Sequence, residues 1–420
     1  MPGVLCVVLV AVYRPWSHTP ESRVLDAWIA ATIAAVAFQC IPLPASIVDR
    51  LSPSARGVWQ ALSLGPVSGA QPLSVDLSST VWALAVCAGS VAAFFVARQV
   101  FASGGVRIVA RGIASVGLVL SALCLAQDAT AHGAMYWRWR PEFAVAPPFG
   151  PFVNRNHFAT WAVLALPPAF GYLLAHGSAH ARAAERVHWR QVLADLVDAR
   201  SIWLVAAICL MLVALVASQS RSGMVGLVAA LALAMYLRGR HGNVPPSGWA
   251  LAALGLAALA AIVRIDPVDL YHRFGTAGAA AADRVSIWRA TLPVVQDFWL
   301  TGTGAGTFET VMLVYQRSPS LFRINAAHNQ FLQILAEGGV LLTIPVAGVL
   351  VAFAREARRA LERDRSGMYL LRVGALSGLA GAAVQSVWET GLSTPANAVL
   401  AAVLGAIVIH RSTHTVRSVD

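Results

Sequence analysis

The stretch AAHNQFLQILAEGGVLLTIPVAGVLVAF, residues 326–353, begins with polar side chains and continues as an apolar run long enough to cross a lipid bilayer. A hydrocarbon core about 30 Å thick requires about 20 mainly apolar residues in a helix. His328 and Asn329 stand at the mouth of this run, and Gln333 and Glu337 follow inside it at four-residue spacing. An ionisable residue within a membrane span is costly, so Glu337 is expected to have a partner or a function.

The composition of the whole chain agrees with a membrane protein. The 420 residues are 57% hydrophobic and 12% charged, with a mean hydropathy of +0.65, whereas soluble domains have about 25% charged residues. Apolar runs predict ten spanning helices, at 25–44, 78–98, 108–126, 157–176, 201–217, 221–237, 247–263, 329–354, 369–386 and 395–410. The short stretch Val4–Tyr13 is a candidate for an eleventh. We therefore predict an all-α, polytopic membrane protein with about 10–12 spans, in a single membrane domain over 1–420.

The basic residues predict how the spans are oriented. The chain has no Lys, so all 31 basic residues are Arg, and they concentrate in every second loop. By the positive-inside rule these loops are cytoplasmic, and the loop 264–327 is the largest on the outer side. The net charge of +11 then follows mainly from topology. Because the arginines are scattered over separate loops, we expect no nucleic-acid partner.

The predicted outer loops carry arginines close to the starts of helices. These are Arg155 in PFGPFVNRNHFA, Arg221 in SQSRSG, and Arg284 in DRVSIWRATLPVVQDFWLTGTGAGTF. Arg at a helix N-terminus is unfavourable, because the helix dipole is positive there. Its repetition on one side of the membrane favours a bound anion, since helix N-termini and the forked guanidinium both suit phosphate oxygens. Together the three arginines would suit a diphosphate at the outer surface.

Simpler interpretations of these residues stay open. Each arginine could be an interfacial anchor, and Arg284 could pair with its neighbour Asp283. In the third motif Trp288 is four residues from Arg284, hence on the same face of a helix, with Arg289 adjacent.

The polar residues of the opening stretch also have structural interpretations. His328 and Asn329 could serve only to cap a helix. The row Asn329, Gln333 and Glu337 could be a polar seam between helices. The outer loops contain no cluster of His, Cys or acidic residues at metal-ligand spacing. The glycine run TGTGAGTF at 301–308 matches no nucleotide-binding motif, and a turn or re-entrant packing is predicted for it.

The blocks NRNHFA, SRSG, DRVSIWRATLPVVQDFWLTGTGAGTF and AAHNQFLQILAEGGVL, in this order, resemble the signature blocks of the bacterial O-antigen ligase and polymerase superfamily. The resemblance implies a helical membrane transferase with the C-type glycosyltransferase architecture, placed in the bacterial inner membrane with its active site facing the periplasm. It implies a donor glycan on undecaprenyl diphosphate, an acceptor that is lipid A-core or another glycan, and no cofactor or metal. Arg221 and Arg284 then correspond to the arginines that hold the diphosphate.

By the same resemblance His328 corresponds to the essential histidine. A histidine is a common general base for removing a proton from an acceptor hydroxyl, and preorganised cations stabilise a leaving diphosphate. Arg155 would assist in binding the donor, while Asn329, Arg289 and Glu337 would support the site. A transporter or flippase of lipid-linked sugars remains the alternative. It should carry charged or broken segments near the midplane of several spans, and here the polar groups gather at one surface.

Overall fold

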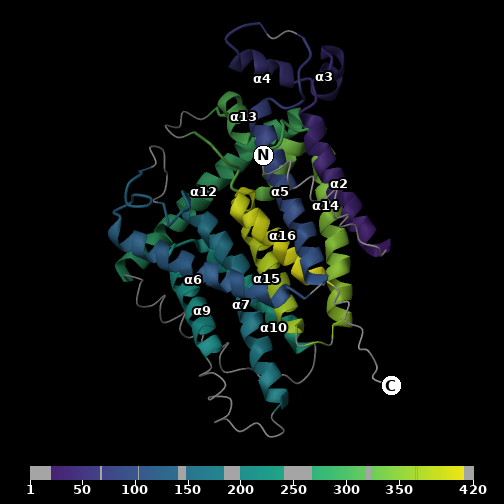
Figure 1. The fold of residues 1–420 in the computed structure, drawn as a ribbon. Coiled ribbons are helices and arrows are strands. Elements are labelled where there is room, and N and C mark those ends of the chain that lie inside the picture. Colours follow the sequence, from purple (N-terminus) through teal and green to yellow (C-terminus); the bar gives the residue numbers. More distant parts are fainter. Residues whose placement is uncertain are drawn as a thin grey trace. The chain divides into compact units, whose positions relative to one another are not determined.

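The computed structural model describes residues 20–66, 69–102, 104–140, 148–183, 199–240, 267–317, 323–364, 366 and 368–410. In these ranges the regular structure is entirely helical (Figure 1). The helices are α2 (Pro20–Gln39), α3 (Ala45–Leu51), α4 (Ala55–Leu62), α5 (Leu77–Ala102), α6 (Val106–Thr130), α7 (Arg155–Ala183), α9 (Ala199–Ala217), α10 (Arg221–Gly239), α12 (Pro267–Asp297), α13 (Phe308–Tyr315), α14 (Gln330–Arg363), α15 (Tyr369–Gln385), the short 3-10 helix η1 (Gly391–Ser393) and α16 (Pro395–Ile409). The prediction of an all-α polytopic fold is confirmed.

Nine of the ten predicted spans coincide with helices, from α2 to α16. Within the described residues five helices are long and apolar enough to cross a membrane: Leu77–Ala102, Val106–Thr130, Arg155–Ala175, Arg221–Gly239 and Gln330–Arg363. Ile202–Ala217 and Pro395–Ile409 are shorter apolar helices. The predicted span 247–263 and the stretch Val4–Tyr13 lie outside the described residues.

The large predicted outer loop, 264–327, contains two helices, α12 and α13, and residues 323–329, which lead to α14, are not helical. The chain forms two compact units, and the first comprises Met1–Val96, His272–Glu356 and Ser386–Thr390. The organisation as a single membrane domain therefore stays a prediction.

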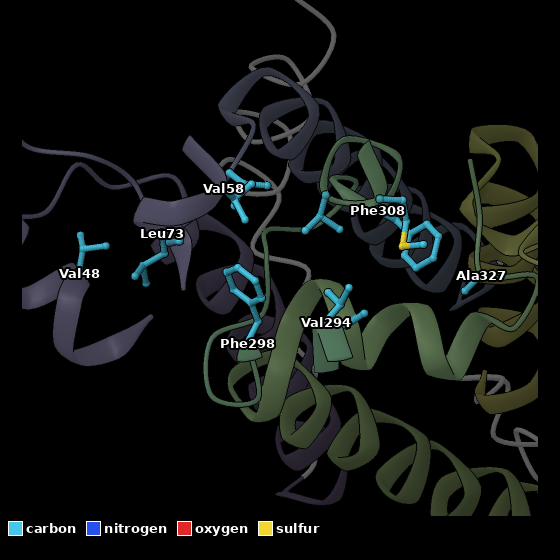
Figure 2. Close-up of a cluster of buried hydrophobic side chains, with 12 residues drawn as sticks. Val48, Val58, Leu73, Val294, Phe298, Phe308 and Ala327 are labelled. Atoms are coloured by element: carbon cyan, nitrogen blue, oxygen red, sulfur yellow. The ribbon is translucent and has the colours of Figure 1, made fainter. Parts of the chain in front are cut away.

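The first unit has a buried hydrophobic cluster that includes residues of α12, the helix that carries Arg284 (Figure 2). Val294 and Phe298 at the end of α12 meet Phe308 at the start of α13, together with Leu73 and Ala327. Burying a large apolar side chain contributes about 1.5–3 kcal/mol. The cluster therefore fixes α12, which carries Arg284, and the segment before α14, which carries His328.

Helix α14 is interrupted at Gly339, whose backbone angles are φ 53° and ψ −158°. In an unbroken helix the N–H groups of Val340 and Leu341 would bond to the carbonyls of Ala336 and Glu337. Instead these N–H groups donate to the carbonyl oxygens of Trp299 and Leu300, at 2.8 and 2.9 Å. A turn at 298–307 therefore enters the break.

The opened carbonyls on the other side of the break are satisfied by the same turn. Thr303 N–H donates to the Ala336 carbonyl at 3.1 Å, and Gly304 N–H donates to the Glu337 carbonyl at 2.9 Å. Two helical hydrogen bonds are thus replaced by four bonds to the turn. The glycine run at 301–308, for which a turn or re-entrant packing was predicted, supplies most of this turn in the break of α14.

The second unit comprises Ala97–Tyr271, Ala357–Gln385 and Gly391–Asp420, and α15 packs against α7 and α10 at its centre. Small residues permit this contact: a side chain at Gly374 of α15 would come within 2.3 Å of the Pro167 carbonyl of α7. Close packing through glycine is typical of helix contacts in membranes. This packing supports the starts of α7 and α10, where Arg155 and Arg221 lie.

Candidate functional site

His328 precedes α14 in the first unit and has an unusual backbone conformation. Its φ is +49°, in the left-handed region, which residues other than Gly, Asn and Asp adopt at a cost of about 1–2 kcal/mol. The next residue, Asn329, caps the helix, because its Oδ1 accepts the Leu332 N–H at 3.0 Å. Asn329 therefore has the capping role that the sequence left open for both residues, and His328 lies outside the helix with 29% of its side chain exposed.

A buried carboxylate joins His328 to Arg284. Glu389, only 1% exposed, accepts a hydrogen bond from Arg284 Nη2 to its Oε1 at 2.6 Å. Its other oxygen, Oε2, lies 3.6 Å from Nδ1 of His328, which is beyond hydrogen-bonding distance but close enough for an ion pair if the imidazole is protonated. All three residues belong to the first unit. A cation, an acid and a base are therefore gathered at one point.

Glu389 was not singled out from the sequence. It lies in the short segment between α15 and α16. A single acidic residue between two apolar helices is the only signal that could have drawn attention to it.

The prediction that Arg284 and Trp288 lie on the same face of a helix is confirmed for α12. Arg284 contacts Glu389, and Trp288 donates its indole Nε1–H to the carbonyl oxygen of Ala327 at 3.0 Å. Ala327 is the residue immediately before His328. Arg289 is exposed on α12. One face of α12 therefore carries both side chains toward the segment that presents His328.

Glu337 receives its partners from the glycine-rich turn. Its Oε2 accepts the Gly306 N–H at 2.8 Å, and its Oε1 accepts the Phe308 N–H at 3.2 Å and Gln333 Nε2 at 3.0 Å. A buried carboxylate is tolerated when its oxygens accept several hydrogen bonds. In this arrangement Glu337 holds the turn in the break of α14.

The second unit presents the other two arginines. Arg155 and Arg221 are the first residues of α7 and α10. Each of these helices is capped by the residue just before it: Asn154 Oδ1 accepts the Asn156 N–H at 2.9 Å, and Ser220 Oγ accepts the Gly223 N–H at 3.2 Å.

Arg155 and the turn that carries Arg221 are in contact within this unit. Nη1 of Arg155 donates to Oε1 of Gln219 at 3.3 Å, and Gln219 has a φ of +56°. Non-glycine residues held at positive φ often mark functional sites, because the strain persists only where surrounding contacts impose it. The second unit therefore brings Arg155 beside the SQSRSG turn, and the first unit brings Arg284 beside His328.

Among the described residues no group of three or more His, Cys, Asp or Glu side chains is placed to hold a metal ion. The absence of a metal requirement stays a prediction.

Residues 206–347 match the family model described as O-antigen ligase. The matched region includes Arg221, Arg284 and His328, while Arg155 and Glu389 lie outside it. No curated protein matches the chain. The family match confirms the resemblance to the O-antigen ligase and polymerase superfamily and supports glycan transfer of the O-antigen ligase type in general.

Proposed function

We propose that the protein transfers an oligo- or polysaccharide from undecaprenyl diphosphate to an acceptor hydroxyl at the periplasmic face of the bacterial inner membrane. The observation that carries this proposal is the grouping of Arg284, Glu389 and His328 in the first unit. The family match supports the reaction class. The donor, the acceptor and the sidedness belong to the proposal.

The chemistry needs one bond formed and one broken. The acceptor oxygen bonds to the anomeric carbon of the donor sugar, and the bond from that carbon to the diphosphate oxygen breaks. The acceptor hydroxyl gives its proton to the imidazole of His328, acting as general base. The electron pair leaves with undecaprenyl diphosphate, whose charge the guanidinium groups of Arg221 and Arg284 stabilise, with Arg155 assisting.

Glu389 fits this scheme as the partner of both cationic groups. Its Oε1 fixes the guanidinium of Arg284 through the 2.6 Å hydrogen bond. Its Oε2, 3.6 Å from Nδ1 of His328, favours the imidazolium that forms when the base takes up its proton. The same carboxylate can thus orient the donor-binding arginine and stabilise the protonated base.

The acceptor can be identified in the host cell. Deleting the chain and analysing surface and lipid-linked glycans distinguishes the two main forms of the activity. Accumulated lipid-linked polymer indicates a ligase that joins polymer to lipid A-core, and single repeats attached to the acceptor indicate a polymerase. Purified protein that moves lipid-linked sugar across a vesicle membrane without transferring it contradicts the proposal and supports a flippase.

A further inference from the structure

We infer that Trp288 and Gln333 are positioning residues for His328 and act through the peptide groups of Ala327. This inference rests on the function proposed above, because it assigns His328 the role of base. It gives the polar residues inside α14 a function that neither membrane insertion nor helix capping requires.

Both polar backbone atoms of Ala327 are held by side chains. The Ala327 N–H donates to Oε1 of Gln333 at 3.1 Å, and its carbonyl oxygen accepts the indole Nε1–H of Trp288 at 3.0 Å. Ala327 is fully buried and lies in the hydrophobic cluster of the first unit (Figure 2). Regular secondary structure would normally satisfy such groups, and here two helices, α12 and α14, supply the partners instead.

These two hydrogen bonds, from the Ala327 N–H to Gln333 and from Trp288 to the Ala327 carbonyl, are called the clamp below. The clamp acts directly on the backbone of His328. The carbonyl of Ala327 and the N–H of His328 belong to one planar peptide group, so fixing the carbonyl oxygen fixes the plane from which the His328 side chain departs. His328 has a φ of +49°, and a conformation of this kind persists only where the surroundings over-determine it. The two hydrogen bonds to Ala327 provide that constraint.

The orientation of the Gln333 amide is set by Glu337. Nε2 of Gln333 donates to Oε1 of Glu337 at 3.0 Å. Because a carboxylate accepts hydrogen bonds, the amide must turn its nitrogen toward Glu337 and its oxygen toward Ala327. The row of polar residues at four-residue spacing is therefore a chain of contacts that runs from the glycine-rich turn to the residue before His328.

Trp288 links this clamp to the donor-binding side of the proposed site. It lies on the same face of α12 as Arg284, which contacts Glu389. A shift of α12 would therefore displace Arg284 and the Ala327 carbonyl together.

The test compares Gln333→Leu and Trp288→Phe with Gln316→Leu. The first variant removes the acceptor for the Ala327 N–H together with the donor to Glu337. The second removes the indole donor and the pyrrole part of the ring while keeping a phenyl ring. Gln316 is a matched control, because its Oε1 accepts the Ile324 N–H at 3.2 Å in the same segment, three residues before Ala327. Full-length protein in nanodiscs is assayed for binding of undecaprenyl diphosphate and for turnover of the lipid-linked glycan fraction extracted from the deletion strain.

A displacement of about 1 Å at a reacting group can lower a rate about 100-fold. We expect turnover at saturating donor to fall about 10- to 100-fold in both clamp variants, with binding of undecaprenyl diphosphate changed less than about threefold. The Gln316→Leu variant should stay within about twofold of wild type in both measurements. Turnover in Trp288→Phe and in Gln333→Leu equal to that of Gln316→Leu would overturn the inference, and Trp288→Phe decides alone if Gln333→Leu does not fold.

Amide hydrogen exchange tests the clamp without the reaction. The peptide covering residues 326–329 should lose protection in Gln333→Leu and keep it in Gln316→Leu, because only the first change frees the buried Ala327 N–H. Unchanged exchange would contradict the clamp itself. Gln333→Leu could lose this protection while the wild-type protein neither binds undecaprenyl diphosphate nor transfers glycan. That result would contradict the proposed function and leave the clamp with a purely structural role.

Discussion

Arg284 and Glu389 are 105 residues apart in the chain, yet Nη2 of Arg284 lies 2.6 Å from Oε1 of Glu389. The Glu389 side chain is 1% exposed and the Arg284 side chain is 30% exposed, so the pair is asymmetric: the acid is enclosed and the arginine is partly open to solvent. An arginine held in this way is directed by its partner and still free to meet an anion with its remaining N–H groups.

Replacing Glu389 by Gln should reduce transfer and stability together. Gln keeps the shape but removes the charge opposite Arg284 and His328. Breaking a buried ion pair costs about 3–5 kcal/mol, and the exposure of Arg284 places the expected loss at or below about 3 kcal/mol. Activity and thermal unfolding should be measured beside Glu309→Gln, which alters an exposed pair with Arg323. Equal behaviour of the two variants would remove Glu389 from the site.

Arg221→Ala and Arg284→Ala should each lower turnover about 100- to 1,000-fold, the usual effect of losing a donor that stabilises developing negative charge. Arg→Lys at either position should also be poor, since a point charge cannot reproduce the bidentate fork. Arg323→Ala is the matched control, because Arg323 is exposed and paired with Glu309. Expression and membrane insertion should be unchanged. Near-normal turnover in both alanine variants would return these arginines to the role of interfacial anchors.

His328→Ala or His328→Gln should remove chemistry and spare donor binding. Loss of a general base lowers the rate about 100- to 10,000-fold, whereas undecaprenyl diphosphate should still bind to the arginines. Single-turnover kinetics with prebound donor separates the two effects. If the alanine variant turns over within a few-fold of wild type, the base is a different residue.

Transfer by the purified protein should survive an excess of chelator. The proposed scheme obtains its positive charge from Arg221 and Arg284, so a divalent ion has no step to perform. The assay should compare untreated protein with protein treated with EDTA. Activity that disappears and returns with Mg²⁺ would show that acidic residues converge on an ion.

Gly339→Ala should destabilise the protein strongly. A Cβ there would lie 2.6 Å from the Gly302 nitrogen and 2.6 Å from the Leu300 carbonyl carbon. The backbone angles of Gly339 are close to a region used almost only by glycine, with a penalty of about 1–3 kcal/mol for other residues. Overpacking adds about 1–3 kcal/mol.

Gly89→Ala provides the control for this substitution. Gly89 lies within α5, and a Cβ at this position meets nothing within 4 Å. Alanine should be neutral or stabilising there by up to about 1 kcal/mol, because it is the better helix former. Similar melting temperatures for the two variants would contradict the close approach of the turn to Gly339.

Features encoded locally could be predicted from the sequence. Apolar length predicted nine described helices, and the places of Arg155 and Arg221 at the starts of helices followed from their positions before apolar runs. The pairing of Arg284 and Trp288 on one face followed from helical periodicity. These predictions need only neighbours within a few residues.

Features that depend on distant parts of the chain could not be predicted in the same way. Glu389 had no local pattern, because its partners come from α12 and from the segment before α14. Glu337 was expected to need a partner. Its carboxylate oxygens accept hydrogen bonds from backbone N–H groups of the glycine-rich turn, and backbone partners cannot be identified from residue types. The left-handed backbone of His328 likewise results from the contacts of Ala327 and not from the histidine itself.

The break in α14 also constrains how the protein can be made. The N–H groups of Val340 and Leu341 bond to the turn and not to their own helix. Without the turn, lipid could not satisfy these groups, and each one exposed to hydrocarbon costs several kcal/mol. The break and the turn must therefore form together, after residues 298–307 and the first half of α14 have both left the ribosome. This span therefore forms together with the loop that precedes it, so a fragment beginning after the turn should fail to produce the native helix.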